Sequence, residues 1–310
     1  MNNKKYQHIF GPVPSRRLGF SLGIDLVPFK TCSFDCIYCQ IERTTNHTLK
    51  RKSFFPYQEV ISELLEKLKG NEHIDYITFS GSGEPTLNSD IGTIINKIKT
   101  ITSIPVSVIT NSSLLYQEEV ISDLKNADLL IPSLDAVTEE TFKKINRPGT
   151  EVILENVLQG LINIKNWFSG EVRLEIMLLK DINDSAKEIE KLVEMAAKIK
   201  PDKIELNSVV RPPVENFAKA IAVDKLEAIA KQFGTVCSVI TAFDSINLPD
   251  NNHKQQALIL TTLKRRPLTI NELQEITGLH IIELTKQLEH LKKETILKET
   301  EYNNQIYYQL

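Results

Sequence analysis

Short apolar runs and amphipathic stretches alternate along the chain as far as about residue 240. The apolar runs are rich in Ile, Val and Leu and stop at polar residues or prolines, which is typical of buried strands. They predict strands at 22–27, 75–80, 105–110, 128–134, 172–179 and 203–210, with a further β-prone segment at 236–240. The stretches between them have apolar residues at helical spacing and predict helices at 56–69, 89–101, 116–125, 138–146, 151–168, 185–199 and 224–233.

Six strand–helix units in succession predict the fold class. Strands that alternate with helices form parallel sheets with the helices packed outside. We therefore expect an α/β fold and, if the sheet curves, a partial (β/α)6 barrel with the loops after each strand gathered on one face. Residues 1–20 are rich in Gly, Pro and Arg and predict a loop or a short hairpin in front of this barrel.

The pattern changes after residue 247. The segment 248–252 (LPDNN) predicts a linker, so we expect a barrel domain at 1–247 and a second domain at 253–310. The elements predicted in the second domain are helices at 253–264, 269–276 and 280–293 and a hairpin of strands at 296–300 and 305–309.

The order of elements in the second domain resembles a winged helix-turn-helix domain. Thr269 and Glu272 fit a capping box, and Gly278 breaks the turn between the last two helices. Counted from His253, this domain has 8 Lys plus Arg and 7 Asp plus Glu, so it is almost neutral. Because a nucleic-acid module usually has a basic face, docking of a protein or substrate, or plain packing, is favoured over nucleic-acid binding.

Composition limits the class of protein further. With 310 residues, 41% of them hydrophobic and 25% charged, the chain has room for one barrel-sized domain and a small appendage. The net charge of −3 argues against a general polyanion binder. No apolar run approaches membrane-spanning length, and the beginning, MNNKKYQHIF, lacks the apolar core of a signal peptide. We therefore expect a cytoplasmic protein without membrane contact, in which thiols stay reduced.

Three of the four cysteines lie in one loop directly after the first predicted strand. Cys32, Cys36 and Cys39 have the spacing C-x3-C-x2-C, whereas Cys237 is distant in sequence. Three thiolates on one loop can bind three irons of a 4Fe–4S cluster and leave the fourth iron open to another ligand. A closed zinc site needs four ligands, and His47 is the only candidate close in sequence. The cluster is the favoured interpretation, and zinc or free thiols are the alternatives.

The residues around these cysteines carry a family resemblance. KTCSFDCIYCQ at 30–40, preceded by GPVPSRRLG at 11–19, resembles the radical S-adenosylmethionine (SAM) superfamily, in the branch related to the wyosine-forming tRNA imidazoguanosine synthases. The phrases SGSGEPTL, INRPG, LEIMLLKDIND and ELNSVVRPP extend the likeness to about residue 215.

This resemblance implies cofactors and a reaction. The cofactors are a 4Fe–4S cluster and SAM, and the electron comes from a donor such as flavodoxin or ferredoxin. The open iron holds the methionine moiety of SAM, and reductive cleavage gives a 5'-deoxyadenosyl radical that takes a hydrogen atom from the substrate. The protein then supplies binding, orientation and shielding.

A glycine-rich turn follows the second predicted strand. Alone it marks only a tight turn. It resembles the GGEP motif of the superfamily, which receives the ammonium group of SAM, although Ser82 stands where the motif has glycine. The alternative is that Glu84 is only a charge at the start of a helix. The candidate cofactor-binding residues of this turn are Gly81, Ser82, Gly83, Glu84 and Pro85.

Further cofactor candidates lie elsewhere on the same predicted face. The resemblance favours a place for Tyr38 beside the adenine, and a core aromatic is the alternative. Four polar residues are candidates for the ribose, the methionine carboxylate or the adenine: Asn111, Ser133, Glu175 and Asn207. Each is equally plausible as an inward-facing structural residue, because a buried polar group needs a partner in any case.

The candidate catalytic residues are Lys30 and Asp135. Asp135 is a candidate substrate contact, and Lys30 is a candidate for neutralising a carboxylate or forming a Schiff base. Arg16 and Arg17 either face an anionic substrate or are solvated surface residues.

The substrate is left open by the sequence. The resemblance points to a tRNA guanosine, but its archaeal members carry upstream cysteines for a second cluster, and this chain has none before Cys32. The negative net charge also argues against tRNA, because phosphate contacts dominate such binding. A different class, an iron–sulfur DNA-binding transcription regulator, explains the two domains but not the GSGEPT turn. A barrel that keeps its cluster and has lost its chemistry is the third alternative.

Overall fold

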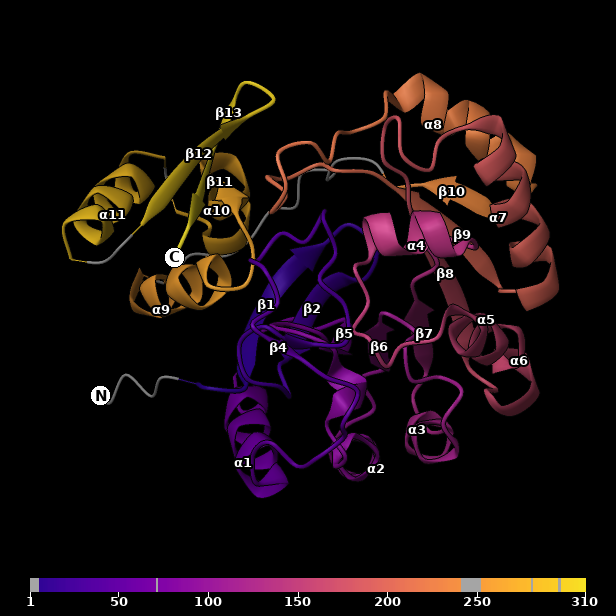
Figure 1. The fold of residues 1–310 in the computed structure, drawn as a ribbon. Helices are drawn as coiled ribbons and strands as arrows, with labels where there is room; N and C mark the ends of the chain where they lie inside the picture. The colour runs from indigo at the N-terminus through magenta and orange to yellow at the C-terminus, as the bar shows by residue number, and fades with distance from the viewer. Residues whose placement is uncertain (1–5, 71, 241–251, 280, 295–296) are drawn as a thin grey trace.

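An eight-stranded sheet forms the larger part of the computed structural model, which describes residues 6–70, 72–240, 252–279, 281–294 and 297–310 (Figure 1). Apart from the antiparallel pair at one edge, every neighbouring pair is parallel. In spatial order the strands are β1 (Ile9–Ser15), β2 (Gly19–Ile24), β5 (Tyr76–Phe79), β6 (Val106–Thr110), β7 (Leu129–Pro132), β8 (Glu171–Met177), β9 (Lys203–Asn207) and β10 (Cys237–Val239).

All six predicted strands are present, so the predicted α/β class with a mostly parallel sheet is confirmed. Two strands differ most from their predicted bounds. The strand expected at 22–27 begins at Gly19, because it pairs with β1. This pairing is the hairpin that was one of the two alternatives for residues 1–20. The strand expected at 203–210 ends at Asn207, because the Ser208 hydroxyl turns back to donate to the Leu178 carbonyl.

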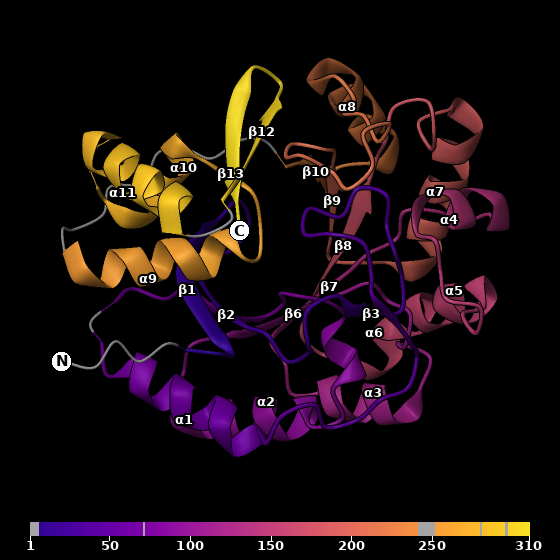
Figure 2. The same cartoon turned by 60° about the vertical axis from the view of Figure 1, so that its left-hand side comes forward.

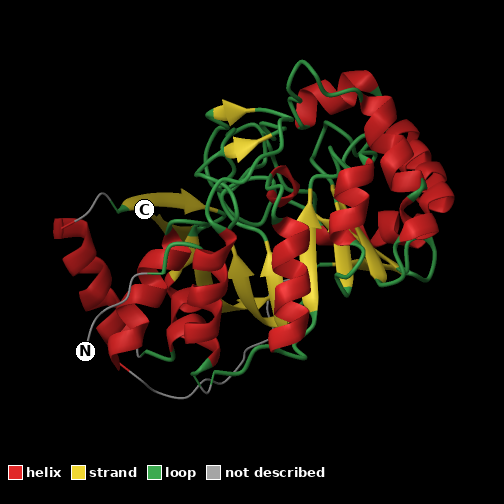
Figure 3. Cartoon of the chain, turned by 90° about the horizontal axis from the view of Figure 1, so that it is seen from below, coloured by secondary structure: helices red, strands yellow, loops and turns green. Residues whose placement is uncertain are grey.

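Helices cover one face of this sheet (Figures 1 and 3). The segment predicted as one helix at 151–168 is divided at Asn163, where a polar residue of low helix propensity ends one helix and precedes the next. The helices are α1 (Tyr57–Leu68), α2 (Ile91–Ile101), α3 (Glu118–Leu124), α4 (Glu139–Ile145), α5 (Leu154–Ile162), α6 (Ile164–Trp167), α7 (Ala186–Ile199) and α8 (Val223–Ala230). Two 3-10 turns, Pro85–Leu87 and Lys231–Phe233, complete this part.

The two faces of the sheet differ in chemistry. Successive side chains of a strand point to opposite faces. On β8, Val172, Leu174 and Ile176 are buried in the main hydrophobic core together with residues of the helices, and we call this the outer face. Arg173 and Glu175 lie on the opposite, inner face, where they make ion pairs.

A small apolar cluster closes the inner face at the amino-terminal ends of the strands. Leu18, in the turn between β1 and β2, packs with Leu129 and Ile131 of β7. Farther along the strands this face is polar, with hydrogen bonds from the Ser21 hydroxyl to Thr78 and between the hydroxyls of Thr78 and Ser107. The inner face is therefore built to hold polar groups.

The C-terminal part has its own core and packs beside β1 (Figures 1 and 2). Its three strands form a separate antiparallel sheet in the order β11-β13-β12. Its elements are α9 (Asn252–Leu263), β11 (Leu268–Thr269), α10 (Ile270–Thr277), α11 (Ile281–Glu294), β12 (Lys298–Tyr302) and β13 (Gln305–Gln309).

Local signals in the C-terminal part are confirmed. Thr269 and Glu272 form a complete capping box, and Gly278 ends α10 with φ of 69°. The predicted linker lies outside the described residues at 248–251, and residue 252 begins α9. The division at 247 and the winged-helix assignment stay predictions.

The described residues contain no helix that is both long enough and apolar enough to span a bilayer.

Candidate cluster and cofactor site

The cysteine loop follows β2 at the carboxyl ends of the parallel strands and is fixed at several points. Two short strands, β3 (Thr31–Cys32) and β4 (Asn46–His47), pair with each other across it. The loop also leans on the end of α4, since the amide of Asp35 donates to the Asn146 carbonyl and that of Ile37 to the Ile145 carbonyl. The three cysteines are thus presented from a backbone that is tied on both sides.

Each of the three sulfur atoms accepts a hydrogen bond from a different side chain. Lys30 Nζ lies 3.2 Å from Cys39 Sγ, Asn111 Nδ2 lies 3.4 Å from Cys32 Sγ, and Asn146 Nδ2 lies 3.5 Å from Cys36 Sγ. Such donors stabilise the negative charge of a thiolate or of a thiolate-bound cluster.

The protonation of Cys32 and Cys36 fits a site that is completed by metal. Burial, together with the nearby Glu84 carboxylate, raises the pKa of the Cys32 thiol to about 12. Burial and Asp135 raise the pKa of Cys36 well above its ordinary value. Both thiols therefore hold their protons without a cation, and binding of iron has to release them.

The zinc alternative needs a fourth ligand beside the three cysteines. All four cysteines are free thiols, so no disulfide competes for them. Among the described residues no group of three or more His, Cys, Asp or Glu side chains is arranged to hold one metal ion. His47, the candidate fourth zinc ligand, is exposed on β4 and its ring lies near Gly149. The zinc alternative gains no support from this geometry.

The glycine-rich turn and the cysteine loop touch through their backbones. The Lys30 amide donates to the Ser82 carbonyl and the Glu84 amide to the Thr31 carbonyl. A Cβ added at Gly83 would lie 1.8 Å from the Thr31 oxygen, so only glycine fits there. Ser82, the departure from the family motif, is accommodated because its hydroxyl and its amide both donate to Asp25.

Glu84 connects this turn to the end of β6 by hydrogen bonds. One carboxylate oxygen accepts from the Thr86 amide, the Thr86 hydroxyl and the Thr110 hydroxyl, and the other accepts from the Asn111 amide at 2.7 Å. Burial raises the pKa of Glu84, and these hydrogen bonds oppose the rise. Within the described part of the chain Oε2 has a single donor and can accept one more hydrogen bond, which leaves room for the predicted ammonium contact.

Asp135 is the centre of a hydrogen-bond network next to Cys36. Its carboxylate accepts from the Tyr38 hydroxyl, from Asn146 Nδ2 and from the Met177 amide at 2.5, 2.7 and 3.1 Å. Burial raises the pKa of Asp135 to about 6, against the opposing effect of these donors. Asp135 therefore orients Tyr38 and Asn146, the asparagine that reaches Cys36, and its role as a substrate contact stays a prediction.

The remaining predicted candidates fall into two groups. Lys30 is buried, and its ammonium faces Cys39, not a carboxylate. Ser133 and Glu175 are neighbours in an isolated bridge between β7 and β8, and Glu175 accepts from Asn207 Nδ2 at 3.0 Å. Burial alone would raise the pKa of Glu175, but the nearby Arg17 and the Asn207 hydrogen bond outweigh it and lower the pKa.

Arg16 and Arg17 both turn toward the inner face. Arg17 pairs with Glu175 at 2.9 Å and with Glu205 at 3.4 Å. Arg16 Nη1 reaches Asn207 Oδ1 at 3.5 Å. The solvated alternative for these two arginines is therefore wrong.

Sequence reasoning missed three contributors to this site. Asn146 lies in the phrase INRPG, but nothing in its spacing marks it as a partner of Cys36. Thr86 and Thr110 hold Glu84, and only the second follows the strand-end pattern. The signal available was position on the cysteine side: Asn146 directly follows α4, Thr110 ends β6, and Thr86 belongs to the 3-10 turn Pro85–Leu87.

The C-terminal hairpin reaches the cysteine loop as well. Gln309 Nε2 donates to the Ile41 carbonyl at 2.9 Å, and Lys298 pairs with Glu42 at 3.0 Å. Tyr302 packs on the apolar cluster that includes Ile37. The hairpin therefore borders the candidate site.

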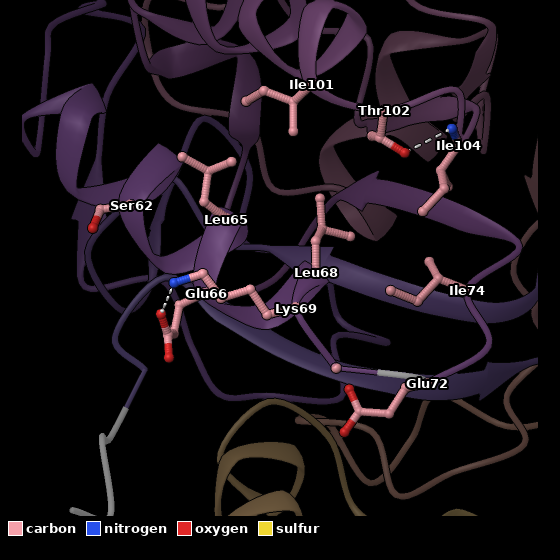
Figure 4. Close-up of a pocket in the computed structure, with 11 residues that line it drawn as sticks. Ser62, Leu65, Glu66, Leu68, Lys69, Glu72, Ile74, Ile101, Thr102 and Ile104 are labelled. Atoms are coloured by element: carbon pink, nitrogen blue, oxygen red, sulfur yellow. Dashed lines mark hydrogen bonds and ion pairs between the residues drawn. The ribbon is translucent and has the colours of Figure 1, made fainter.

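A larger hollow lies away from the cysteines. A hollow of about 680 Å³ is bounded by α1, α2 and the segment leading into β5, with Leu65, Leu68 and Ile74 among its walls (Figure 4). It opens at the amino-terminal side of β5, opposite the cysteines, so we do not assign the chemistry to it. A narrow cavity lined by Asn111, Ser133, Asp135 and Asn146 adjoins the candidate site instead.

A parallel α/β sheet with three cysteines at its carboxyl edge defines the class of radical SAM folds. The family model described as the radical SAM superfamily matches residues 26–200. The chain belongs to this superfamily, and the cofactors of this enzyme class are a 4Fe–4S cluster and SAM.

Two relatives and one solved structure illustrate the likeness. A UPF0026 protein of Methanocaldococcus jannaschii is 40% identical over 224 residues, which cover 72% of this chain and 68% of that protein. A protein named GTPase Obg of Brachyspira hyodysenteriae is 44% identical over 86% of this chain, and the match spans only 40% of that protein. The crystal structure of Streptococcus suis SuiB bound to precursor peptide SuiA has a TM-score of 0.54 and 14% identity, covering 76% of this chain and 50% of that one.

Proposed function

We propose that Cys32, Cys36 and Cys39 hold the cluster and that the chain uses it to cleave SAM and abstract hydrogen from a substrate held at the inner face. The observation that carries this proposal is the set of three sulfur atoms, each with its own N–H donor, on a loop tied to the glycine-rich turn. When bound, the reduced cluster and SAM supply a 5'-deoxyadenosyl radical.

The residues of the chain have three tasks in this proposal. The turn from Gly81 to Pro85 offers backbone groups to SAM. Its contact with Thr31 fixes the position of this turn relative to the cysteine loop. Asn111 and Asn146 donate to cysteine sulfurs and so tie the cluster loop to β6 and to α4. Asp135 fixes the side chain of Tyr38, which lies in the loop between Cys36 and Cys39. A closed site of this kind protects reactive species from water.

The test is an anaerobic assay of the full chain. After reconstitution with iron and sulfide, dithionite and SAM are added, and 5'-deoxyadenosine and methionine are quantified. We expect both products in equal amounts, dependent on the reductant. A fully loaded and reduced cluster that yields neither product would contradict the proposal.

The identity of the substrate and the place of the chain in the wyosine-related branch are further proposals. A tRNA guanosine is supported by the quoted motifs alone, and we expect an electron donor of the flavodoxin or ferredoxin type and a cytoplasmic setting. The alternative, a DNA-binding regulator, would need a free recognition surface on the proposed winged helix. Glu272 of α10 pairs with Arg211 of the barrel, and Arg265 of the C-terminal part pairs with Asp25 of the barrel. Charged groups of this module are therefore used in contacts with the barrel.

Gel retardation separates these two functions. We expect no DNA to be retarded by the reconstituted protein, with or without SAM. Promoter DNA that is retarded in the absence of SAM, by a protein that cleaves no SAM in the assay above, would favour the regulator.

A further inference from the structure

Three arginines from three separate parts of the chain meet beside the inner face. Arg16 belongs to the turn after β1, Arg211 to the loop after β9, and Arg266 to the loop after α9. Arg211 is only 5% exposed, and the other two are partly buried. Arg266 Nη2 donates to the Pro14 carbonyl at 3.4 Å, which places it next to the segment that carries Arg16.

These arginines share one close carboxylate. Glu272 pairs with Arg211 at 2.6 Å, and no ion pair of Arg16 or Arg266 is found with any carboxylate in the described part of the chain. Deeper on the inner face three carboxylates are matched by three cations: Glu175, Glu205 and Glu171 are paired with Arg17, Arg173 and Lys203. The three outer guanidinium groups therefore carry a local surplus of two positive charges.

The surplus charge is unfavourable in the protein alone. Burial lowers the pKa of Arg16 to about 10, with a further decrease caused by Arg211 and Arg17. Burial and the same neighbour, Arg211, lower the pKa of Arg266 to about 9. Buried like charges persist in folded proteins where they serve a ligand or a partner.

Donor groups at this place also lack acceptors. The Nε atoms of Arg211 and Arg266 are buried and have no hydrogen-bond partner among the residues that the structure describes. A buried donor without a partner costs about 1–3 kcal/mol, so an incoming anion would satisfy a real deficit. Guanidinium groups match the geometry of carboxylates and phosphates and can bind them with paired hydrogen bonds.

We propose that Arg16, Arg211 and Arg266 form a binding site for a phosphate group of the substrate. The site borders the inner face, because Arg16 reaches Asn207, which in turn binds Glu175. A phosphate monoester carries a charge of about −1.5 to −2 at neutral pH, which balances the surplus, whereas a carboxylate balances half of it. That the phosphate belongs to a substrate rests on the function proposed above; the anion site itself does not.

The site is tested by calorimetric titration of the full-length reconstituted protein with inorganic phosphate, without SAM or reductant. We expect saturable binding at one site. Arg266→Gln and Arg211→Gln should each weaken the affinity at least about tenfold, because each removes charge-assisted hydrogen bonds. Arg43→Gln is the matched control: it removes one positive charge, but Glu215 keeps its pair with Arg147. Its affinity should change less than about twofold.

Two further measurements distinguish a phosphate site from a carboxylate site and from a purely structural cluster. Acetate should bind at least about tenfold more weakly than phosphate; equal binding would show a carboxylate site and overturn the proposal. Arg266→Met should leave the melting temperature unchanged or raise it, because it removes a surplus buried charge. A melting temperature lowered by more than about 5 °C would show a structural role instead. Absence of saturable phosphate binding to the unaltered protein would overturn the site outright.

This experiment is independent of the SAM assay. Cys36→Ala, which should lose the cluster, should still bind phosphate with the original affinity. Phosphate binding without SAM cleavage would contradict only the proposed function. SAM cleavage without phosphate binding would contradict only the anion site.

Discussion

The outer and inner faces of the same strands are built on opposite principles. On the outer face of β8, Leu174 and its neighbours have no exposed surface and pack against helices. On the inner face of β8, one residue away, Glu175 and Arg173 hold ion pairs and hydrogen bonds. The strand is thus divided lengthwise into a stabilising side and a binding side.

This difference separates what folds the chain from what the chain does. The outer face supplies a large continuous apolar core that includes Leu64, Ile94 and Leu192 of the helices. Burial of such side chains stabilises the fold by about 1.5–3 kcal/mol each. The inner face instead keeps buried charges that contribute little or negative net stability. Mutations on the two faces should therefore have separable consequences.

The largest effect of a substitution is expected at the carboxyl edge of the sheet, where the cysteine loop lies. Cys36→Ala should abolish cluster binding and all formation of 5'-deoxyadenosine while the protein stays folded, because the loop is held by backbone bonds to α4. Iron and sulfide content, circular dichroism and product formation are the measurements. Cys237→Ala, in β10, is the matched control and should keep both cluster and activity. An active Cys36→Ala protein would remove the basis of the proposed function.

A pair of substitutions compares the two faces directly. Leu174→Ala on the outer face should lower the free energy of unfolding by about 2–5 kcal/mol, because it leaves a cavity in a packed core. Ser107→Ala on the inner face should lower it by about 1 kcal/mol, since one hydrogen bond to Thr78 is lost and Thr78 keeps Ser21. Urea unfolding measures both. Equal losses would mean that the faces do not differ in the way described.

The third prediction concerns pH. The pKa of Asp135 is raised from 3.8 to about 6 in the folded protein, so the folded state binds more protons than the unfolded state between these values. Its contribution to stability is therefore greatest below about pH 4 and is lost as pH rises through 6, by about 3 kcal/mol in total. In the protein without cluster, Asp135→Asn should remove this pH-dependent part. Urea unfolding at pH 4.5 and 7.5 compares the two proteins. An identical pH dependence in both would show that Asp135 titrates normally.

The features that could be predicted from the sequence are those that repeat at regular spacing or lie within one short segment. The strands were predictable because outer-face residues such as Ile77, Val108 and Leu174 recur with the spacing of a buried strand. The cysteine loop and the glycine-rich turn were predictable because their residues are contiguous. Their position at the carboxyl edge followed from the alternation of strands and helices.

Contacts between distant segments were beyond this reasoning. The meeting of Arg16, Arg211 and Arg266 depends on where the C-terminal part packs, and no local pattern specifies that position. Asn146 was missed for the same reason, because its partner Cys36 lies 110 residues away in sequence. The break at Asn163 was missed because apolar spacing continues across it and only the local backbone shows where one helix ends.

The contact of Gln309 with the carbonyl of Ile41 has a practical consequence for handling the protein. Leu310 is tied down as well, since its amide donates to the Leu263 carbonyl. A purification tag fused directly after Leu310 would extend from the rim of the cysteine loop and compete with reconstitution of the cluster by offering its own histidines to iron.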